Sequence, residues 1–422
     1  MLILHLSDIH FRKSEISTVQ DPNLHLRNEI IRDAAEQCAE LGPPNVIVIS
    51  GDIAFAGDPE EFVYATRWLE KLCVACGCPM SSIFVVPGNH DVVRSVAEQN
   101  MVQMIHRTIK ESANPTAEIF RQLNDPLAQR LLYAGLENYN EFASQFLCDL
   151  LPPERTSAKR DLTLNDGSTL RLWGLNSAFV SSGHDRERDL FVDQASFQIM
   201  REDGVVNLVV THHHLSWLRQ ARELEDHLND VAPIQIFGHV HMNRINLDRD
   251  YVRLTASAAN PDRHERGWEP GYNLIQLSID REGQERTLQV KAHVRVWQTA
   301  PSGFHAKMDR SRLPFFKQRI NLENWTPPEA TLVTSPTHVE VARPHEMPTD
   351  DSAVMGTVRN LALRFYKLSF SKKSEIVGRL DLLEDEDMHS PDFERFRRVF
   401  IRANERGLLS ALDNAITEVE QR

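Results

Sequence analysis

Five short motifs rich in Asp, His, Asn and Gly constrain the fold of this chain most, because each lies at or just past the end of an apolar, strand-like run. In open α/β sheets, ligands bind in the crevice beyond the carboxyl ends of the strands. We therefore expect an α/β fold that brings distant residues to one site. The motifs are Asp8-Ile9-His10, Gly51-Asp52, Gly88-Asn89-His90-Asp91, His212 within Thr211-His212-His213-His214, and Gly238-His239-Val240-His241.

The first third of the chain alternates between strand-like and helix-like segments. Leu2–Leu6, Val46–Ile49 and Ile83–Val86 are short apolar runs typical of buried strands. Arg27–Leu41 and Glu60–Cys73 carry apolar residues at helical spacing. This βαβαβ order predicts a parallel or mixed sheet with helices on its faces.

Strand-like runs return beyond residue 158, at Leu170–Leu175, Val205–Thr211 and Ile234–Phe237, and helices are predicted near Asp193–Arg201 and Ser216–Leu228. The pattern then changes to consecutive strands without intervening helices. This change predicts a second sheet, and hence a sandwich of two sheets flanked by helices. The consecutive runs are Val252–Ala256, Tyr272–Ile279 and Leu288–Trp297.

Composition divides the 422 residues further. Residues 94–158 are dominated by helical patterning and predict an insertion within a catalytic domain that spans 1–312. Residues 313–350 are proline-rich and aperiodic, which is typical of a linker. Helical periodicity resumes in residues 351–422 and predicts a small all-α C-terminal module.

The residue types in the motifs suit a pair of divalent cations. Two cations about 3.5–4 Å apart can clamp both the attacking and the leaving oxygen of an in-line displacement. Carboxylate, imidazole and amide oxygen are suitable ligands, and Asp52, beside the permissive Gly51 at a strand end, suits the bridging position. Gly88 and Gly238 are expected to let the backbone turn where a side chain would collide.

The spacing within two of the motifs predicts how their side chains point. Residues two apart on an extended segment face the same side. Asp8 and His10 are therefore expected to face one cation from an extended segment, and His239 and His241 share the same alternation.

In order and content, the five motifs resemble those of the calcineurin-like metallophosphoesterase superfamily, in its bacterial type. The family pattern is D-x-H, G-D, G-N-H-D/E, H and G-H-x-H, and every part of it is present over roughly residues 1–300. The resemblance implies a four-layer α/β/β/α sandwich of two mixed sheets. It also implies cleavage of phosphodiester bonds by in-line attack of a hydroxide that bridges two metal ions.

The resemblance also assigns roles to residues. It places Asp8, His10, Asp52 and His241 on the first metal, and Asp52, Asn89, His212 and His239 on the second. His212 is preferred over His213 and His214 because the family ligand follows a V-x-x-H strand end. Manganese is favoured, with iron, zinc or cobalt as alternatives.

Two further residues are implied to take part in catalysis. In the family, the His of G-N-H-D lies near the leaving-group oxygen, so His90 is expected to be a general acid or to stabilise charge in the transition state. Asp91 is expected to accept the second ring N–H of His90 and so to fix its tautomer.

Charge, cysteine content and hydropathy indicate which partners and which cellular compartment suit this chain. A net charge of −13 counts against long duplex DNA as a partner, because phosphate contacts come from Lys and Arg. Five Cys in so long a chain are expected to be structural and to suit a reducing cytoplasm. The N-terminus has the pattern of a core strand and no apolar run approaches membrane-spanning length, so we expect a cytoplasmic protein with no membrane partner.

These observations favour a phosphodiesterase acting on a nucleotide or cyclic nucleotide. The resemblance supports this choice, since an intact Asp-x-His motif is associated with diesterase capability in the superfamily. A metal-dependent DNA or RNA nuclease is the alternative, and it would need a basic groove. A protein phosphatase is disfavoured because Asp91 stands where those relatives have Glu. A non-catalytic metal-binding scaffold is also disfavoured, because His90 is retained although it is no obvious ligand.

The C-terminal module loosely resembles small helical adaptor domains that are appended to bacterial effectors, including phage-defence proteins. This resemblance implies that the module recruits a protein partner or drives self-association, while the N-terminal part is the effector. The segments that carry it are Leu368-Ser369-Phe370-Ser371-Lys372-Lys373, Gly378-Arg379-Leu380 and Phe396-Arg397-Arg398-Val399-Phe400.

Overall fold

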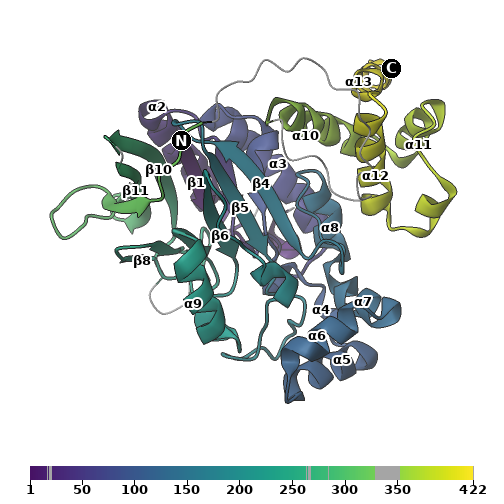
Figure 1. Ribbon diagram of the computed structural model, residues 1–422, viewed down its shortest axis with the longest axis horizontal. Helices are drawn as coiled ribbons and strands as arrows, with labels where there is room; N and C mark the ends of the chain where they lie inside the picture. The colour runs from purple at the N-terminus through teal and green to yellow at the C-terminus, as the bar shows by residue number, and fades with distance from the viewer. Residues whose placement is uncertain are drawn as a thin grey trace.

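The computed structural model describes all residues except 17, 19–20, 263, 265–267, 284, 328–351 and 422. Two mixed sheets lie at its centre, helices flank them, and a separate group of helices forms the C-terminal part (Figure 1). This arrangement confirms the predicted sandwich. Within the described part of the chain, no helix is both long and apolar enough to cross a membrane.

The first sheet has seven strands, with β1, β2 and β3 parallel at one side and β10 antiparallel to β1. Every residue of β1, β2 and β3 is buried, as expected for strands covered on both faces. The strands are β1 (Leu2–Leu6), β2 (Val46–Ile49), β3 (Ile83–Val85), β10 (Gly271–Glu282), β11 (Glu285–Thr299), β12 (Ser302–Ala306) and β13 (Phe316–Leu322).

The second sheet has six strands in the order β4-β5-β6-β7-β9-β8. The prediction that the consecutive late strands start this sheet was wrong in part. Only β9 belongs to it, whereas β10 and β11 pair antiparallel and extend the first sheet. The strands of the second sheet are β4 (Ser157–Thr163), β5 (Thr169–Leu175), β6 (Val205–Thr211), β7 (Ile234–Phe237), β8 (Arg244–Leu247) and β9 (Val252–Thr255).

The helix α3 shows why the flanking helices form where they do. Asp58 caps its N-terminus by accepting a hydrogen bond from the backbone of Glu60, and Pro59 occupies the first turn. Gly77 ends the helix in the left-handed conformation, with φ of 72°. The flanking helices are α1 (Lys13–Ile16), α2 (Leu24–Leu41), α3 (Pro59–Cys76) and α9 (Ala221–Val231), with 3₁₀ turns η1 (Met80–Ser82), η2 (Asn89–Asp91), η4 (Gln194–Phe197) and η5 (Leu215–Trp217).

Two predicted helices of this region differ in the structure. The helix expected near Asp193–Arg201 is only the 3₁₀ turn η4. The helix expected near Ser216–Leu228 is divided into η5 and α9. In both places, apolar residues at helical spacing are buried in the main hydrophobic core without forming one continuous helix. Burial of the side chains, and not backbone propensity, decides the local conformation here.

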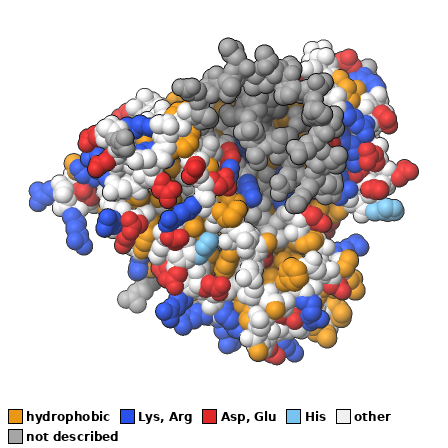
Figure 2. Space-filling model, in the orientation of Figure 1, with side chains coloured by type: hydrophobic (Ala, Val, Ile, Leu, Met, Phe, Trp, Pro, Cys, Tyr) orange, Lys and Arg blue, Asp and Glu red, His pale blue; other side chains and the backbone are white. Residues whose placement is uncertain are grey.

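Short helices fill the stretch after residue 94, where the sequence predicts a helical insertion. Their outer surface is unusually apolar (Figure 2), with Met101, Met104, Phe120 and Leu127 all more than half exposed. The helices are α4 (Arg94–Ala97), α5 (Asn100–Glu111), α6 (Pro115–Leu123), α7 (Pro126–Tyr133), the 3₁₀ turn η3 (Ala134–Leu136) and α8 (Glu137–Ser144).

The C-terminal helices have a hydrophobic core of their own, built around Phe365, Phe396 and Phe400. Leu147, which follows α8, is also part of this core. The helices are α10 (Ser352–Tyr366), α11 (Phe370–Arg379), the 3₁₀ turn η6 (Asp385–His389), α12 (Asp392–Glu405) and α13 (Leu409–Glu420).

The proline-rich segment begins later than predicted. Residues 316–322, assigned to the linker from the sequence, form the strand β13, which pairs with β11 from Ala292 to Arg286. The sheet therefore continues past the predicted boundary at residue 312. The remainder of the predicted linker, from residue 328 onwards, lies outside the described residues.

Candidate metal centre

The register of the strands brings the motifs to one edge of the two sheets. In the first sheet, Leu6 pairs with Ile49, and Ile49 pairs with Val85. In the second sheet, Thr211 pairs with Phe237. The chain leaves each of these strands at nearly the same level and runs directly into a motif, so the carboxyl ends of parallel strands converge as the topology requires.

Most of the predicted ligands have an unusual backbone conformation. Asp8, His10 and Asp52 have φ between 51° and 54°, and His239 and His241 have φ of 67° and 53°. The prediction that the Asp-x-His and His-x-His segments are extended was therefore wrong. A left-handed conformation is unfavourable for residues with a Cβ, and it persists where the surroundings over-determine it, typically at functional sites.

Glycines allow the close approach of these loops, as predicted. A Cβ on Gly88 would lie 2.1 Å from Oδ1 of Asp52, and one on Gly51 would lie 2.5 Å from Nδ1 of His212. A Cβ on Gly238 would lie 2.3 Å from Oγ of Ser7. Any side chain at these positions would collide with the residues of the site itself.

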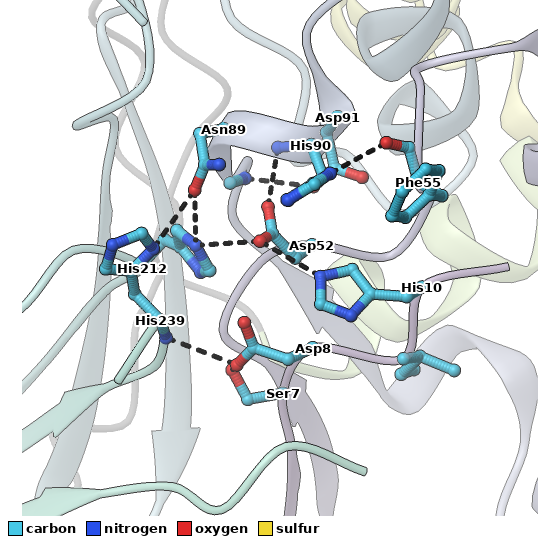
Figure 3. A network of polar contacts seen from close by, with 12 residues as sticks. Ser7, Asp8, His10, Asp52, Phe55, Asn89, His90, Asp91, His212 and His239 are labelled. Atoms are coloured by element: carbon cyan, nitrogen blue, oxygen red, sulfur yellow. Dashed lines mark hydrogen bonds and ion pairs between the residues drawn. The ribbon is translucent and has the colours of Figure 1, made fainter. Parts of the chain in front are cut away.

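Asp52 lies at the centre of the site (Figure 3). Its Oδ2 is 3.3 Å from Nε2 of His10 and 3.2 Å from Nε2 of His212. Its Oδ1 accepts a hydrogen bond of 2.8 Å from the backbone N–H of His90. One carboxylate oxygen thus faces imidazoles from both sheets, which is the placement that a bridging ligand needs.

The contacts of His212 fit a cation. Its Nδ1 donates to the carbonyl of Ser50 at 2.8 Å, so Nδ1 carries a proton. Its Nε2 faces two acceptors, Oδ2 of Asp52 at 3.2 Å and Oδ1 of Asn89 at 3.1 Å. A nitrogen that faces two oxygen acceptors needs either a second proton or a cation held in common, and a divalent metal ion meets that need.

The remaining predicted ligands are placed on either side of Asp52. Oδ1 of Asp8 is 3.2 Å from Nε2 of His241, and Nδ1 of His239 is 3.1 Å from Oδ1 of Asn89. The structure thus brings all seven predicted ligands together. Four overlapping groups have ligand atoms within 4.8 Å of one another: Asp8, His10 and His241; His10, Asp52 and His90; Asp8, Asp52 and His212; and His212, His213 and His239.

The protonation equilibria show how strongly these groups interact. Burial disfavours the charged forms of both Asp52 and His212, yet each stabilises the charge of the other. As a result, the pKa of Asp52 falls well below its usual range and the pKa of His212 rises to about 9. The buried carboxylates of Asp8 and Asp52 therefore demand positive charge at this position, which protons or cations can supply.

The three consecutive histidines separate into different environments. Nδ1 of His213 contacts Oγ of Ser177 at 2.8 Å, and its buried Nε2 has no hydrogen-bond partner among the residues that the structure describes. Nδ1 of His214 contacts Ser216 instead, on the turn that leads away from the site. The preference for His212 stays a prediction, and His213 joins it as a candidate because it groups with His212 and His239.

His90 and Asp91 differ from their predicted arrangement. Nδ1 of His90 donates to the backbone carbonyl of Phe55 at 2.8 Å, whereas Asp91 accepts from the backbone N–H groups of Ala54 and Gly88 at 2.8 and 2.9 Å. The prediction that Asp91 fixes the tautomer of His90 was wrong. Asp91 instead ties the loops of the second and third motifs together, and the Phe55 carbonyl holds the imidazole.

The sequence analysis missed the residues that orient the ligands. Ser50 and Phe55 act through their carbonyls, which have no sequence signature. Trp217 packs edge-on against His239 with ring centroids 4.2 Å apart. The turn that carries Trp217 follows the third histidine directly, and an aromatic residue so close to a ligand motif is the one signal that the sequence offered.

The two-sheet fold and the candidate metal ligands fit the metallophosphoesterase class. The model of the calcineurin-like phosphoesterase family matches residues 1–243, and the chain belongs to this family. A second model, that of the GTPase-associated adaptor domain, matches residues 357–418 and so covers most of the C-terminal module.

Individual relatives are distant. The uncharacterized metallophosphoesterase-like protein YydB of Bacillus subtilis is 22% identical over 307 residues, which cover 68% of this chain and 59% of YydB. The glycerophosphodiester phosphodiesterase GpdQ of Enterobacter lignolyticus is 32% identical over 95 residues, or 22% of this chain and 30% of GpdQ. A predicted phosphoesterase of Streptococcus pneumoniae is similar in structure, with a TM-score of 0.27, 11% identity and coverage of 76% and 97%. The chain therefore spans less than two thirds of the length of either sequence relative.

Proposed function

We propose that the chain is a dinuclear-metal phosphodiesterase acting on nucleotides or cyclic nucleotides. One observation supports this most directly: Oδ2 of Asp52 lies within 3.3 Å of imidazole nitrogens from both sheets. The family match and the local similarity to a glycerophosphodiester phosphodiesterase support the same reaction class. Manganese is the proposed metal, since carboxylate, imidazole and amide oxygen ligands accept it.

The proposed ligands divide into two sets that share Asp52. Asp8, His10 and His241 complete the first set, and Asn89, His212 and His239 complete the second. Two divalent cations in these sets would polarise the phosphoryl oxygens, stabilise the developing charge and lower the pKa of a water molecule. The positions of the ligands are fixed by buried backbone contacts, so little reorganisation is required on binding.

His90 is proposed to move the proton of the leaving oxygen. The Phe55 carbonyl keeps Nδ1 protonated, so Nε2 is the nitrogen left for exchange with a substrate. The ring of Phe55 stacks on His90 with centroids 5.0 Å apart and limits its rotation. Asp91 is proposed to act indirectly, by holding the backbone of Gly88 in place.

The test is hydrolysis by the purified, manganese-loaded chain. The substrates are a panel of cyclic nucleotides, bis-(p-nitrophenyl) phosphate, and single- and double-stranded DNA. We expect cleavage of the small diesters, with a loss of roughly 100-fold or more in Asp52→Asn and His212→Ala and of about 10²–10⁴-fold in His90→Ala. His214→Ala is the matched control from the same histidine run and should retain activity.

The outcomes separate the alternatives. Cleavage of DNA that is lost in Asp52→Asn would replace the proposed function with a nuclease. Absence of hydrolysis on every substrate, with manganese bound, would instead point to a metal-binding scaffold. Equal activity of the His212→Ala and His214→Ala variants would contradict the proposed ligand set.

We also propose that residues 351–422 recruit a protein partner or drive self-association, while residues 1–322 carry the catalysis. The adaptor-domain match supports this division. Phe370 and Met388 are exposed apolar side chains of the module, at 53% and 58%. Light scattering should show a smaller assembly for Phe370→Ser with Met388→Ser if the module self-associates through these side chains.

A further inference from the structure

A cavity of about 690 Å³ lies where the catalytic domain meets the C-terminal helices. Its lining includes residues of the segment 151–160, one residue of α10 (Arg359) and four of α12 (Glu394, Arg397, Arg398 and Ile401). None of the proposed metal ligands lines it. Its volume falls within the range of about 300–1,000 Å³ that is typical of small-molecule sites.

The lining of this junction cavity is strongly basic, although the chain as a whole carries a net charge of −13. Only two acidic residues, Glu154 and Glu394, appear among its lining residues. The basic residues are Arg155, Lys159, Arg160, Arg359, Arg397 and Arg398. Positive charge is thus concentrated at a position where the molecule brings two parts of the chain together.

Half of these cations are already paired. Arg155 contacts Asp149 at 2.5 Å and Glu394 at 2.8 Å, and Arg397 contacts Asp149 at 2.7 Å. Arg398 contacts Glu394 at 2.9 Å. Two of these pairs, Arg155–Glu394 and Arg397–Asp149, hold α12 against the catalytic domain. Together the four pairs leave little acceptor capacity for the other cations.

Arg160 and Arg359 lack such partners. Arg160 is 3% exposed and donates only to the carbonyls of Ser81 and Phe146, at 3.2 and 3.0 Å. Within the described part of the chain, neither guanidinium has a carboxylate within 4.0 Å. Burial lowers the pKa of Arg359, and the more distant charge of Asp161 only partly offsets this effect. Burial lowers the pKa of Arg160, and the positive charge of Arg359 lowers it further. The two cations are therefore close enough to repel each other, which is unfavourable in free energy. Buried cations without counter-ions are unfavourable, and an anion between them would remove that cost.

An aromatic surface adjoins the two cations. Trp173 of β5 lines the cavity, and Nζ of Lys159 lies 4.2 Å from the centre of its ring. Lys159 is on β4, next to Arg160, and its side chain is exposed. A flat ring beside guanidinium and ammonium groups suits a ligand that carries both a phosphate and a planar base.

We propose that the junction cavity binds a small phosphate-bearing anion, whose oxygens accept hydrogen bonds from Arg160 and Arg359 and which bridges β4 and α10. Such a ligand contacts both the catalytic domain and the C-terminal module, so its binding stabilises their docked arrangement. The site is separate from the proposed metal centre, and the inference does not depend on the reaction catalysed there.

The test uses the full chain loaded with manganese, with inorganic phosphate and adenosine monophosphate as probes. Calorimetry gives the affinities, and hydrogen exchange locates the protected segments. Binding at the junction should protect β4, α10 and α12, whereas binding at the metal centre should protect the motif loops. We expect Arg359→Gln to weaken junction binding about tenfold, because one charge-assisted hydrogen bond is lost.

Two further variants make the result decisive. Lys159→Gln changes an exposed side chain of the same cavity and should also weaken binding, without risk to folding. Arg222→Gln in α9 is the matched control, since it removes an exposed arginine outside the cavity. Hydrolysis of bis-(p-nitrophenyl) phosphate should be unchanged in all three.

Each outcome decides the proposal. Protection of β4 and α10 that is lost in Arg359→Gln supports it, and tighter binding of the nucleotide than of phosphate would show that the Trp173 surface takes part. Protection confined to the motif loops would overturn it. Equal binding by the Arg359→Gln and Arg222→Gln chains would overturn it as well.

Discussion

At the scale of single residues, the site is built on strained positions. Five of the proposed ligands have a left-handed backbone, which costs roughly 1–2 kcal/mol per residue. Ligand identity is therefore coupled to loop geometry: the side chains reach the centre only because the backbone turns back sharply after each strand. The neighbouring glycines make this arrangement possible, because they have no side chain and so leave space where the loops meet.

Gly88 gives the sharpest prediction at this scale. In Gly88→Ala, the new Cβ would collide with both the carboxylate and the backbone nitrogen of Asp52, so Asp52 must move. We expect a loss of about 1–3 kcal/mol in the free energy of unfolding, together with weaker manganese binding in calorimetry. Gly303→Ala in β12, where a Cβ meets open space, is the control and should change neither quantity. Unaltered manganese affinity in Gly88→Ala would show that Asp52 is not held by this contact.

At the scale of elements, the sequence predicted what depends on local pattern. Apolar runs followed by a motif predicted β1, β2, β3, β6 and β7, because burial on both faces leaves a continuous apolar signature. The strand β13 was missed because three consecutive polar residues, Lys317 to Arg319, break its alternation of apolar and polar residues, and because it lies in a proline-rich context. The partner of His90 was also missed, because a backbone carbonyl leaves no trace in the sequence.

A buried histidine in the helical insertion should make the stability of the chain depend on pH. His106 of α5 is 3% exposed, and burial, with help from Lys110, lowers its pKa from 6.5 to about 4. The folded chain therefore holds His106 neutral where the unfolded chain would bind a proton. Its contribution to stability is complete above pH 6.5 and is lost as the pH falls towards 4.

Urea unfolding from pH 7 to pH 4 checks this expectation. The wild-type chain should lose stability over this interval more steeply than His106→Leu, which has no proton to bind. His184→Leu, in an exposed loop position, is the control and should keep the wild-type slope. Parallel curves for the wild type and His106→Leu would show that His106 does not titrate as described.

At the scale of the whole molecule, one buried carboxylate joins the two parts of the chain. Asp149 is 1% exposed and accepts from Arg155 of the catalytic domain and from Arg397 of α12. Burial raises its pKa, but the two guanidiniums outweigh this effect and hold the pKa below its usual range. The docking of the C-terminal module thus depends on a charge that cannot be left unpaired.

Asp149→Asn tests this dependence with almost no change in shape. Breaking a buried ion pair leaves uncompensated charge, so we expect a loss of about 3 kcal/mol in denaturant unfolding. A separate early transition of the C-terminal helices should accompany it. Glu418→Gln breaks the exposed pair with Arg379 and should cost less than about 1 kcal/mol. Equal effects of the two substitutions would refute a special role for Asp149.

The place of Leu147 in the core of the C-terminal helices has a practical consequence for dissecting the protein. Adaptor modules are commonly treated as interchangeable parts that can be cut away at a linker or transplanted to another enzyme. Here the structural boundary between the two parts does not coincide with the linker. A truncation before α10 would expose Leu147 to solvent and remove Arg397, one of the two cations that pair with Asp149. A loss of activity in the truncated chain could then result from damage to the catalytic part, and not from the loss of a partner. A faithful transplant must carry the 147–155 segment with the helices.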